Sequence, residues 1–413
     1  MNEKKIKVAI GFATGRKHFQ RVLRSYVFNW FESQLVSDVN VGLNLFVAYD
    51  LEYRNTKRTD YTSIKPEVSQ WLEGQYFYGK QEIEETRRSL VGSGVITQAE
   101  ASMLFRKGYA AQRNIILYQA IKNKMDYLMF LDDDEYPMAV TKNSDTALWG
   151  GQQVLKTHLK NIQAADITHG YHCGYISPIP YIDFSDRLPE DQFRLFVEAI
   201  SNDILNWDNV KRVMSNGGVT YADIGVLVNR EVFEVPEINH AKFISGSNLC
   251  INLTDPSRVF PFFNPPGARG EDTFLSTCLS ERKVLRVPCY AFHDGFSSYN
   301  HLLTGVLPTQ LKYIKPDSDQ IIRRFYAACI GWIRYKPLLL YITDQAHYED
   351  KITVMTENLR RTLPLVCDYF HYPLFTNILD ELRKCSGTVE KQYHAYEETL
   401  RIWAKIMTSA CAE

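Results

Sequence analysis

The feature that most constrains the fold is an apolar run that ends in four consecutive acidic residues. The run covers Tyr127–Leu131, and residues 132–135 follow it as Asp-Asp-Asp-Glu. An unbroken apolar run of strand length after the amphipathic helical pattern of Gly108–Lys124 is typical of a strand buried on both faces of an α/β sheet. Ligands bind at the carboxyl ends of strands in such sheets, so the acidic residues are predicted to lie at a ligand site.

Strand and helix patterns alternate along the first half of the chain. Ile6–Phe12 and Val41–Asp50 have strand patterns, and a helical pattern over Phe19–Leu35 separates them. The alternation predicts an α/β fold with a mostly parallel, Rossmann-like sheet flanked by helices. Further strands are predicted at Thr168–Ile176, Val219–Val228, Ala241–Leu253 and Val284–Phe292.

From about residue 300 only helical patterns remain, so we expect a helical C-terminal region over residues 300–413. Within it, Arg323–Lys336 mixes basic and aromatic residues. One interpretation is a helix for a membrane surface or a partner, including a second copy of the chain. The preferred interpretation is a stripe of apolar residues that packs on the α/β domain. Arg334 and Lys336 interrupt the longest apolar stretch, Phe325–Thr343, which argues against a membrane-spanning helix.

The composition excludes several classes of protein. The chain has 413 residues, of which 45% are hydrophobic, and this is not the profile of a disordered protein. Lys and Arg total 47 against 48 for Asp and Glu, so no basic excess indicates nucleic-acid binding. The eight cysteines have no paired CxxC spacing, and no apolar leader opens the chain. We therefore expect reduced thiols and a cytoplasmic location, with peripheral contact at the inner face of the membrane as an open alternative.

Four neighbouring carboxylates repel one another unless a cation neutralises them. Alternate side chains of an extended segment point the same way, so Asp132 and Asp134 are predicted to face one site. Oxygen ligands of this kind suit Mg²⁺ or Mn²⁺, which keep open positions for phosphate oxygens. The competing interpretation is a solvated acidic turn after the strand.

A helix carrying Arg113 and Asn114, then an apolar strand, then the acidic triplet together resemble the nucleotide-sugar core of GT-A glycosyltransferases of the family-2 type. In that family the triplet is the "DxD" motif, which binds a metal and the ribose-diphosphate of the donor. The resemblance extends over about residues 5–296. Two long segments, Leu51–Lys107 and Thr141–Gln192, exceed what the family core usually needs.

Other short stretches match the family in the same order along the chain. A turn at Thr14–Arg16 follows the first strand, Asp50 ends the second, Gly270–Asp272 resembles the "GED" segment, and His293 follows a late strand. The resemblance implies donor contacts from Thr14, Arg16, Asp50, Arg113, Asn114, Asp132 and Asp133. It implies metal ligands at Asp132, Asp134 and His293, and catalytic roles for Asp272 and Glu271.

Structural roles compete with these assignments at several positions. Arg113 could instead be a charge on the surface of its helix. His293 could be a hydrogen-bonded residue at the end of a strand. Residues 271–272 could be the acidic start of a helix, which the helix dipole favours. Residues 245–248 suit either a strand turn or contacts with sugar hydroxyls. In the strand at 169–173, alternation separates His172 from the other histidine, so a shared metal site there is not expected.

The resemblance implies a metal-dependent glycosyltransferase of carbohydrate biosynthesis that uses Mn²⁺ or Mg²⁺. The donor would be a nucleoside diphosphate sugar, with UDP favoured, and the acceptor a glycan, a lipid-linked sugar or a small molecule. Inversion is favoured, with Asp272 as base. The catalytic domain would cover residues 1–299, with a nucleotide-sugar half over about 1–140 and an acceptor half over about 141–299.

Two alternatives remain open. A sugar-nucleotide nucleotidyltransferase resembles the same fold but usually has a glycine-rich basic loop after its first strand. Here that stretch holds only Gly11 and Gly15. The other alternative is a non-catalytic carbohydrate-binding or scaffold protein, which the acidic triplet, Asp272 and His293 together disfavour.

Overall fold

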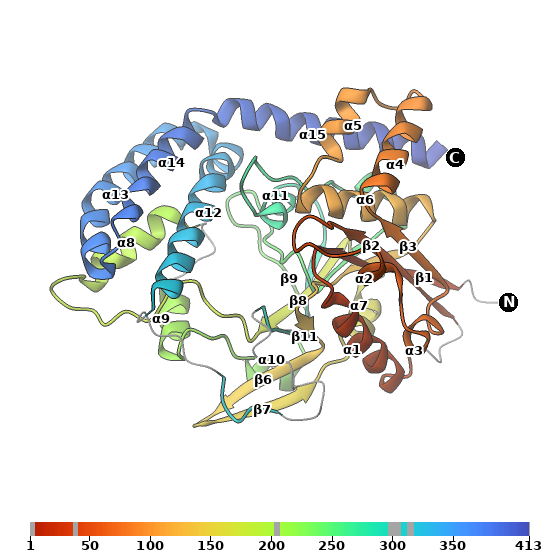
Figure 1. The fold of residues 1–413 in the computed structure, drawn as a ribbon, viewed down its shortest axis with the longest axis horizontal. Coiled ribbons are helices and arrows are strands. Elements are labelled where there is room, and N and C mark those ends of the chain that lie inside the picture. The colour runs from red at the N-terminus through yellow and green to blue at the C-terminus, as the bar shows by residue number, and fades with distance from the viewer. Residues whose placement is uncertain (1–4, 36–39, 202–206, 296–306, 312–317, 413) are drawn as a thin grey trace.

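A computed structural model describes residues 5–35, 40–201, 207–295, 307–311 and 318–412, and a curled sheet forms its centre (Figure 1). The strands run in the order β3-β2-β1-β4-β10-β8-β11-β5, with β9 beside β11. The strands of this sheet are β1 (Ile6–Thr14), β2 (Val41–Tyr49), β3 (Gly74–Tyr78), β4 (Tyr127–Phe130), β5 (Glu135–Tyr136), β8 (Ile167–Cys173), β9 (Phe233–Glu234), β10 (Leu249–Asn252) and β11 (Val284–His293). A separate hairpin consists of β6 (Met138–Asn143) and β7 (Thr146–Gly151).

The α/β class and the helical C-terminal region are confirmed, but the sheet is mixed rather than mostly parallel. Among the described strands, β3, β2, β1 and β4 pair in parallel, as do β8 and β11. Strand β10 enters between β4 and β8 and is antiparallel to both, and β5 and β9 are antiparallel to β11. The sequence does not reveal this insertion, because β10 follows β8 only after a long excursion of the chain.

The described helices cover both faces of the sheet and form a layer beside it (Figure 1). They are α1 (Phe19–Glu32), α2 (Thr59–Thr62), α3 (Pro66–Ser69), α4 (Lys80–Gly92), α5 (Gln98–Leu104), α6 (Tyr109–Lys122), α7 (Val154–Ile162), α8 (Glu190–Ile200), α9 (Trp207–Ser215), α10 (Ile224–Asn229), α11 (Glu271–Ser276), α12 (Asp319–Thr343), α13 (Tyr348–Phe370), α14 (Asn377–Ser386) and α15 (Val389–Ala412).

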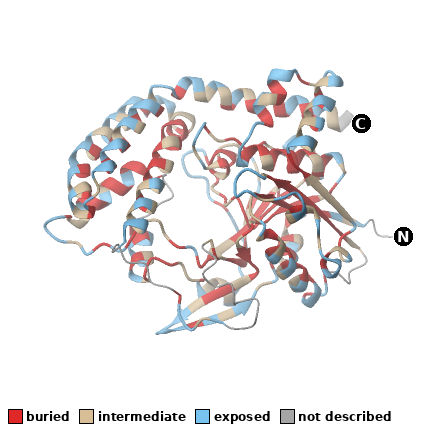
Figure 2. Cartoon of the chain, in the orientation of Figure 1, coloured by how far each residue is buried: buried red, intermediate tan, exposed pale blue. Residues whose placement is uncertain are grey.

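Alternation along the central strands explains their continuous apolar sequences. In β1, Val8, Ile10 and Phe12 belong to the core cluster that contains α1, whereas Ala9 and Ala13 belong to the cluster on the α6 face. All four residues of β4 are buried, and Figure 2 shows buried residues throughout the middle of the sheet. A strand with helices on both faces has no polar face, which is why the pattern of Tyr127–Leu131 lacks alternation.

Most of the predicted elements are present, but two strand predictions are wrong in part. Within Val219–Val228 the chain forms helix α10, whose first turn is capped by Asp223 as its carboxylate accepts a hydrogen bond from Gly225 N. Apolar β-branched residues in so short a helix resemble a strand pattern. Of Ala241–Leu253, only the last residues form β10, because the chain turns at Asn248, where φ is +49°.

The C-terminal helices share a third apolar core with α8 and α9. At its centre the ring of Phe325 lies within 6.2 Å of the rings of Phe193 and Phe196. The apolar stripe of Arg323–Lys336 is buried, as the preferred interpretation expected, but it packs within the helical layer, against α14 and α8, and belongs to a core cluster separate from those of the sheet. The expected domain boundary between residues 299 and 300 lies outside the described residues. None of the helices in the described part of the chain has both the length and the apolar content that crossing a membrane requires.

Helix α15 ties this helical layer back to the first half of the chain (Figure 1). Arg401 and Lys405 form ion pairs with Glu100 of α5, at N–O distances of 2.8 and 2.6 Å. Glu100 also accepts a hydrogen bond from Thr97 N at 2.7 Å, which caps α5. Its bonds with Lys405 and then Thr97 lower the pKa of Glu100 to about 2.

We predict that Glu100→Gln lowers the free energy of unfolding by about 1 kcal/mol at pH 7, because two cations lose their anion while the cap is kept. A lowered pKa gives a contribution that is complete above the ordinary value of 4.5 and is lost as pH falls towards 2. The difference between wild type and variant in urea unfolding should therefore shrink over that interval. The control Glu398→Gln removes an exposed partner of Arg401, and an equal or larger loss there would contradict the account.

Candidate active site

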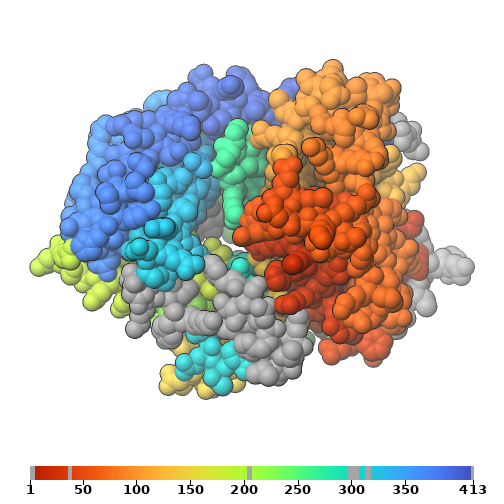
Figure 3. Space-filling model, in the orientation of Figure 1, coloured from red at the N-terminus to blue at the C-terminus, as the bar shows by residue number. Residues whose placement is uncertain are grey.

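A cleft of about 1020 Å³ opens at the carboxyl end of β1, β2 and β4. Figure 3 shows the molecule hollowed between the N-terminal segments in red and orange and the segments in green and cyan. The parallel strands β1 and β4 end side by side, so the turn after β1 and the acidic residues after β4 line one wall. The start of α11 and the loop before it line another wall.

The turn after β1 holds two of the acidic side chains. The Thr14 hydroxyl donates a hydrogen bond to Asp133 Oδ2 at 2.5 Å, and Arg16 N in turn donates to Thr14 Oγ1 at 3.0 Å. Nη1 of Arg16 lies 3.1 Å from Asp133 Oδ1 and 2.5 Å from Asp134 Oδ2. Arg16 is thus the cation that neutralises this side of the acidic group. Burial alone would lower the pKa of Arg16, but the two carboxylates outweigh it and raise that pKa.

Arg113 neutralises the other side, from inside the protein. Its side chain is only 2% exposed, and Nη2 lies 3.2 Å from Asp132 Oδ1 while Nε lies 3.4 Å from Glu271 Oε1. Nη1 donates to the carbonyl of Gly246. The guanidinium also lies over three aromatic rings, those of Tyr109, Phe130 and Phe262. Arg113 is therefore a buried link between the two walls of the cleft and not a surface helix charge.

Glu135 is paired separately, at the floor of the cleft. Its Oε2 lies 3.3 Å from His172 Nε2 and accepts a hydrogen bond from the Ser247 hydroxyl at 2.8 Å. Burial would raise the pKa of Glu135, but His172 outweighs burial and lowers it. For His172, burial acts to lower the pKa, and Glu135 outweighs it and raises that pKa. Glu135 is consequently an anion whose partners, His172 and Ser247, are different from the arginines that pair with the three aspartates before it.

Those aspartates are only partly neutralised. Burial and then Glu135 raise the pKa of Asp132 to about 6, although Arg113 opposes this. Burial raises the pKa of Asp133 to about 7 against the effect of Arg16, and neighbouring Asp134 adds to the rise. Burial is the main cause of both rises and neighbouring carboxylates add to them, so a cation bound beside these aspartates would favour their charged forms.

His293, at the end of β11, comes close to the acidic group. Its Nε2 lies 3.6 Å from Asp134 Oδ1, and its buried Nδ1 has no hydrogen-bond partner. A neutral imidazole beside a carboxylate is a ligand pair that suits Mn²⁺. In the part of the chain that the structure describes, no group of three or more His, Cys, Asp or Glu side chains is already arranged to hold a metal ion. Asp134 instead faces Arg16 with one carboxylate oxygen and His293 with the other.

Asp272 faces the cleft from the first turn of α11. Its Oδ2 accepts a hydrogen bond from Gly246 N at 3.0 Å and its Oδ1 accepts one from Thr273 N at 2.9 Å. Gly270 stands directly before α11 with φ at +103°, a conformation that favours glycine. The helix starts from this turn, and its first two residues line the cleft. Burial and then Asp272 raise the pKa of Glu271 to about 7. Residues 271–272 are thus both a helix start and part of the cleft.

Most of the residues predicted for the site line this one cleft: Arg16, Asp50, Arg113, Asp132, Asp133, Asp134, Glu271, Asp272 and His293. Thr14 and Asn114 do not line it. Thr14 is buried and acts on the cleft through Asp133 and Arg16. Asn114 lies in the core, where its amide accepts from Phe262 N and donates to Phe262 O at 2.7 and 2.9 Å.

The sequence reasoning missed several lining residues, among them Tyr109 and Tyr175. Tyr109 donates a hydrogen bond from its hydroxyl to Asp132 at 3.0 Å, and the ring of Tyr175 lies 5.4 Å from that of His293. His172 and Ser247 also line the cleft. Alternation in β8 did place His172 on the face opposite the other histidine, but it could not identify that face as the cleft. For Ser247, the turn and sugar-contact interpretations both remain compatible with its position.

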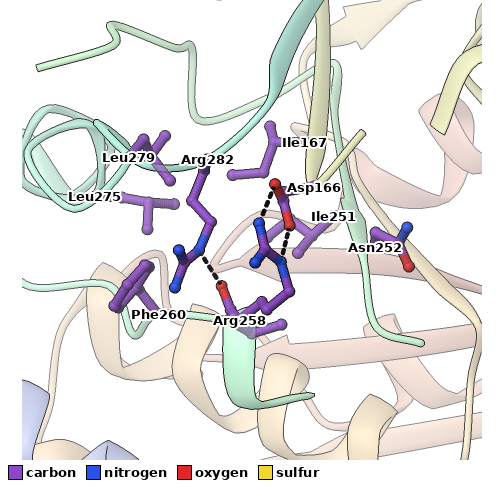
Figure 4. A pocket seen from close by; sticks show the side chains of 10 residues that line it. Asp166, Ile167, Ile251, Asn252, Arg258, Phe260, Leu275, Leu279 and Arg282 are labelled. Carbon is purple, nitrogen blue, oxygen red and sulfur yellow. Dashed lines mark hydrogen bonds and ion pairs between the residues drawn. The ribbon is translucent and has the colours of Figure 1, made fainter. Parts of the chain in front are cut away.

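A second, small cavity lies where β8 begins and β10 ends, beside the ion pair of Asp166 with Arg258 (Figure 4). It measures about 10 Å³, room for roughly one water molecule. Arg258 donates two hydrogen bonds to the carboxylate of Asp166, at 2.5 and 2.8 Å. Arg282 Nε donates to the carbonyl of Arg258 at 3.1 Å. Leu275 and Leu279, which follow Asp272 in the chain, pack against this group. The network therefore anchors the segment of α11 to the sheet and offers no ligand site.

Neither the available family models nor the curated proteins give a match to this sequence. The chemistry of the site is therefore argued from its own residues. The described lining of the cleft combines seven carboxylates with four arginines, one lysine and two histidines, so carboxylates outnumber the arginines and lysine.

We predict that Arg113→Met lowers the free energy of unfolding by about 3 to 5 kcal/mol, because it leaves buried carboxylates unpaired. The loss should be smaller at pH 6 than at pH 8, since Glu271, with its pKa of about 7, takes up a proton at the lower pH. Urea unfolding at both pH values measures this.

The matched control is Arg106→Met. Arg106 also lines the cleft, but it is exposed and its guanidinium donates only to the Asn264 carbonyl, at 2.8 Å. We expect a loss below about 0.5 kcal/mol for it. Equal losses in the two variants would contradict the assigned role of Arg113.

Proposed function

We propose that the protein is a metal-dependent glycosyltransferase, which moves a sugar from a nucleoside diphosphate sugar to a hydroxyl of an acceptor. UDP-sugars are the favoured donors. One observation supports the proposal above the others: the acidic end of β4, His293 at the end of β11 and Asp272 on α11 meet in one cleft. These segments are distant in the sequence, and each was expected in the site because of its resemblance to a glycosyltransferase motif.

The donor side of the cleft suits a diphosphate with a divalent cation. Asp132, Asp134 and His293 would hold Mn²⁺ or Mg²⁺, and the carboxylate oxygens together with the Nε2 of His293, 3.6 Å from Asp134, fit that role. The bound cation would supply charge stabilisation for the departing diphosphate. Asp50, which follows β2, lines the same cleft and would contact the base. The volume of about 1020 Å³ is ample for a nucleotide sugar.

The acceptor side is built around Asp272. As the acceptor hydroxyl attacks the anomeric carbon, the new carbon–oxygen bond forms and the bond to the diphosphate breaks. The proton of the hydroxyl passes to Asp272, and the diphosphate leaves with the bonding electrons. Gly246 N, by its hydrogen bond of 3.0 Å, orients the carboxylate for this task. In a retaining reaction, Asp272 would bind the acceptor instead.

We predict that Mn²⁺ with UDP raises the melting temperature of the wild type and that Asp134→Asn loses this rise. Binding to the folded state contributes about 2.7 kcal/mol at a hundredfold excess over the dissociation constant. Asp186→Asn, at an exposed position outside the cleft, should keep the full rise. If no nucleoside diphosphate stabilises the wild type with Mn²⁺, the proposed donor site is wrong.

We further predict that Asp272→Asn lowers turnover about 10²- to 10⁴-fold and leaves UDP affinity unchanged, because the base acts only in the reaction. Since the acceptor is unidentified, the slow hydrolysis of UDP-sugars by water provides the assay. Release of UDP supports a transferase, whereas pyrophosphate release from a nucleoside triphosphate would support a nucleotidyltransferase. Nucleotide binding with neither reaction would support a binding protein.

A further inference from the structure

We infer that Arg16 is an exchangeable counter-ion: it occupies the acidic centre when no metal is bound, and it moves to the diphosphate when metal and nucleotide bind together. This inference rests on the proposed function, since it needs the metal and diphosphate at this cleft. It adds a specific consequence, namely that metal and nucleotide assist each other's binding through one side chain.

The contacts of Arg16 place its guanidinium where a metal ion would compete with it. A single nitrogen, Nη1, bridges Asp133 and Asp134, at 3.1 and 2.5 Å. The second oxygen of Asp134 lies 3.6 Å from His293. A cation held by Asp134 and His293 would therefore stand beside a fixed positive charge, which is unfavourable at short range. Metal binding and the present position of Arg16 exclude or weaken each other.

The two arginines that pair with the acidic triplet differ in their freedom to leave it. Arg113 is 2% exposed and is held by Asp132, Glu271 and a backbone carbonyl. The side chain of Arg16 is 30% exposed, faces the cleft and binds Asp133 and Asp134, of which Asp134 is a proposed metal ligand. Its backbone stays fixed by the bond from Arg16 N to Thr14 Oγ1. The guanidinium can thus rotate about a fixed anchor without unfolding its surroundings.

A diphosphate is the partner that suits the displaced guanidinium. The planar group binds phosphate oxygens through paired hydrogen bonds. The diphosphate would share the bound cation with the aspartates, so it arrives next to the anchor of Arg16. If the metal binds without nucleotide, the guanidinium of Arg16 loses its carboxylates and finds no phosphate to replace them. If the nucleotide binds without metal, the acidic group repels its phosphates. Each ligand therefore binds weakly alone and more tightly with the other.

The test is a Mn²⁺ titration followed by electron paramagnetic resonance, with and without UDP, on the wild type, Arg16→Met and the exposed neighbour control Lys17→Met. We expect UDP to tighten Mn²⁺ binding by the wild type and by Lys17→Met about tenfold or more, within the usual range of coupling between sites. Arg16→Met should bind Mn²⁺ alone more tightly than the wild type, and UDP should change its affinity about threefold at most.

Arg16→Lys keeps the charge without the paired donors, and it serves if Arg16→Met does not fold. It should bind Mn²⁺ alone as the wild type does, with a smaller effect of UDP. Equal Mn²⁺ affinity of Arg16→Met and wild type without UDP, or the same UDP effect in both, would overturn the exchange. If neither protein binds Mn²⁺ with any nucleoside diphosphate, the proposed function fails and the exchange fails with it.

Discussion

The site depends on the repulsion among the carboxylates that follow β4. Two arginines pair with these aspartates, Arg113 from the core and Arg16 from the turn after β1. His293 approaches Asp134 from the end of β11. Even so, burial keeps the pKa values of Asp132 and Asp133 raised, to about 6 and about 7. Keeping several carboxylates charged so close together in a partly buried place is costly, and a bound cation would offset that cost by favouring their charged forms.

The fold explains how the charge is concentrated. Parallel pairing of β1 with β4 brings the turn of Arg16 beside the acidic residues, and β11 brings His293 to the same edge. The buried guanidinium of Arg113 then connects this wall to Gly246 and Glu271, so the facing helix α11 is held at the cleft. The acidic group that would attract the cation is thus linked, through one arginine, to the wall from which Asp272 would act.

Much of this could be predicted from the sequence, because the relevant signals are local. The buried strand, the acidic triplet and the start of α11 are each readable from a short stretch, and their order indicated a shared edge. What could not be predicted depends on distant pairing. The antiparallel insertion of β10 makes the sheet mixed. The hydrogen bonds of Asn114 with Phe262 hold Asn114 in the core and away from the cleft. The pairing of Glu135 with His172 and Ser247 likewise joins three separate segments.

The most direct test of the central claim is pulsed electron paramagnetic resonance of Mn²⁺ bound with UDP. If the acidic end of β4 holds a cation that carries the diphosphate, the bound Mn²⁺ will show phosphorus couplings from UDP and a nitrogen coupling from one imidazole. His293→Gln should remove the nitrogen coupling and keep the phosphorus couplings. A bound Mn²⁺ without phosphorus coupling, or a nitrogen coupling that survives in His293→Gln, would contradict the account.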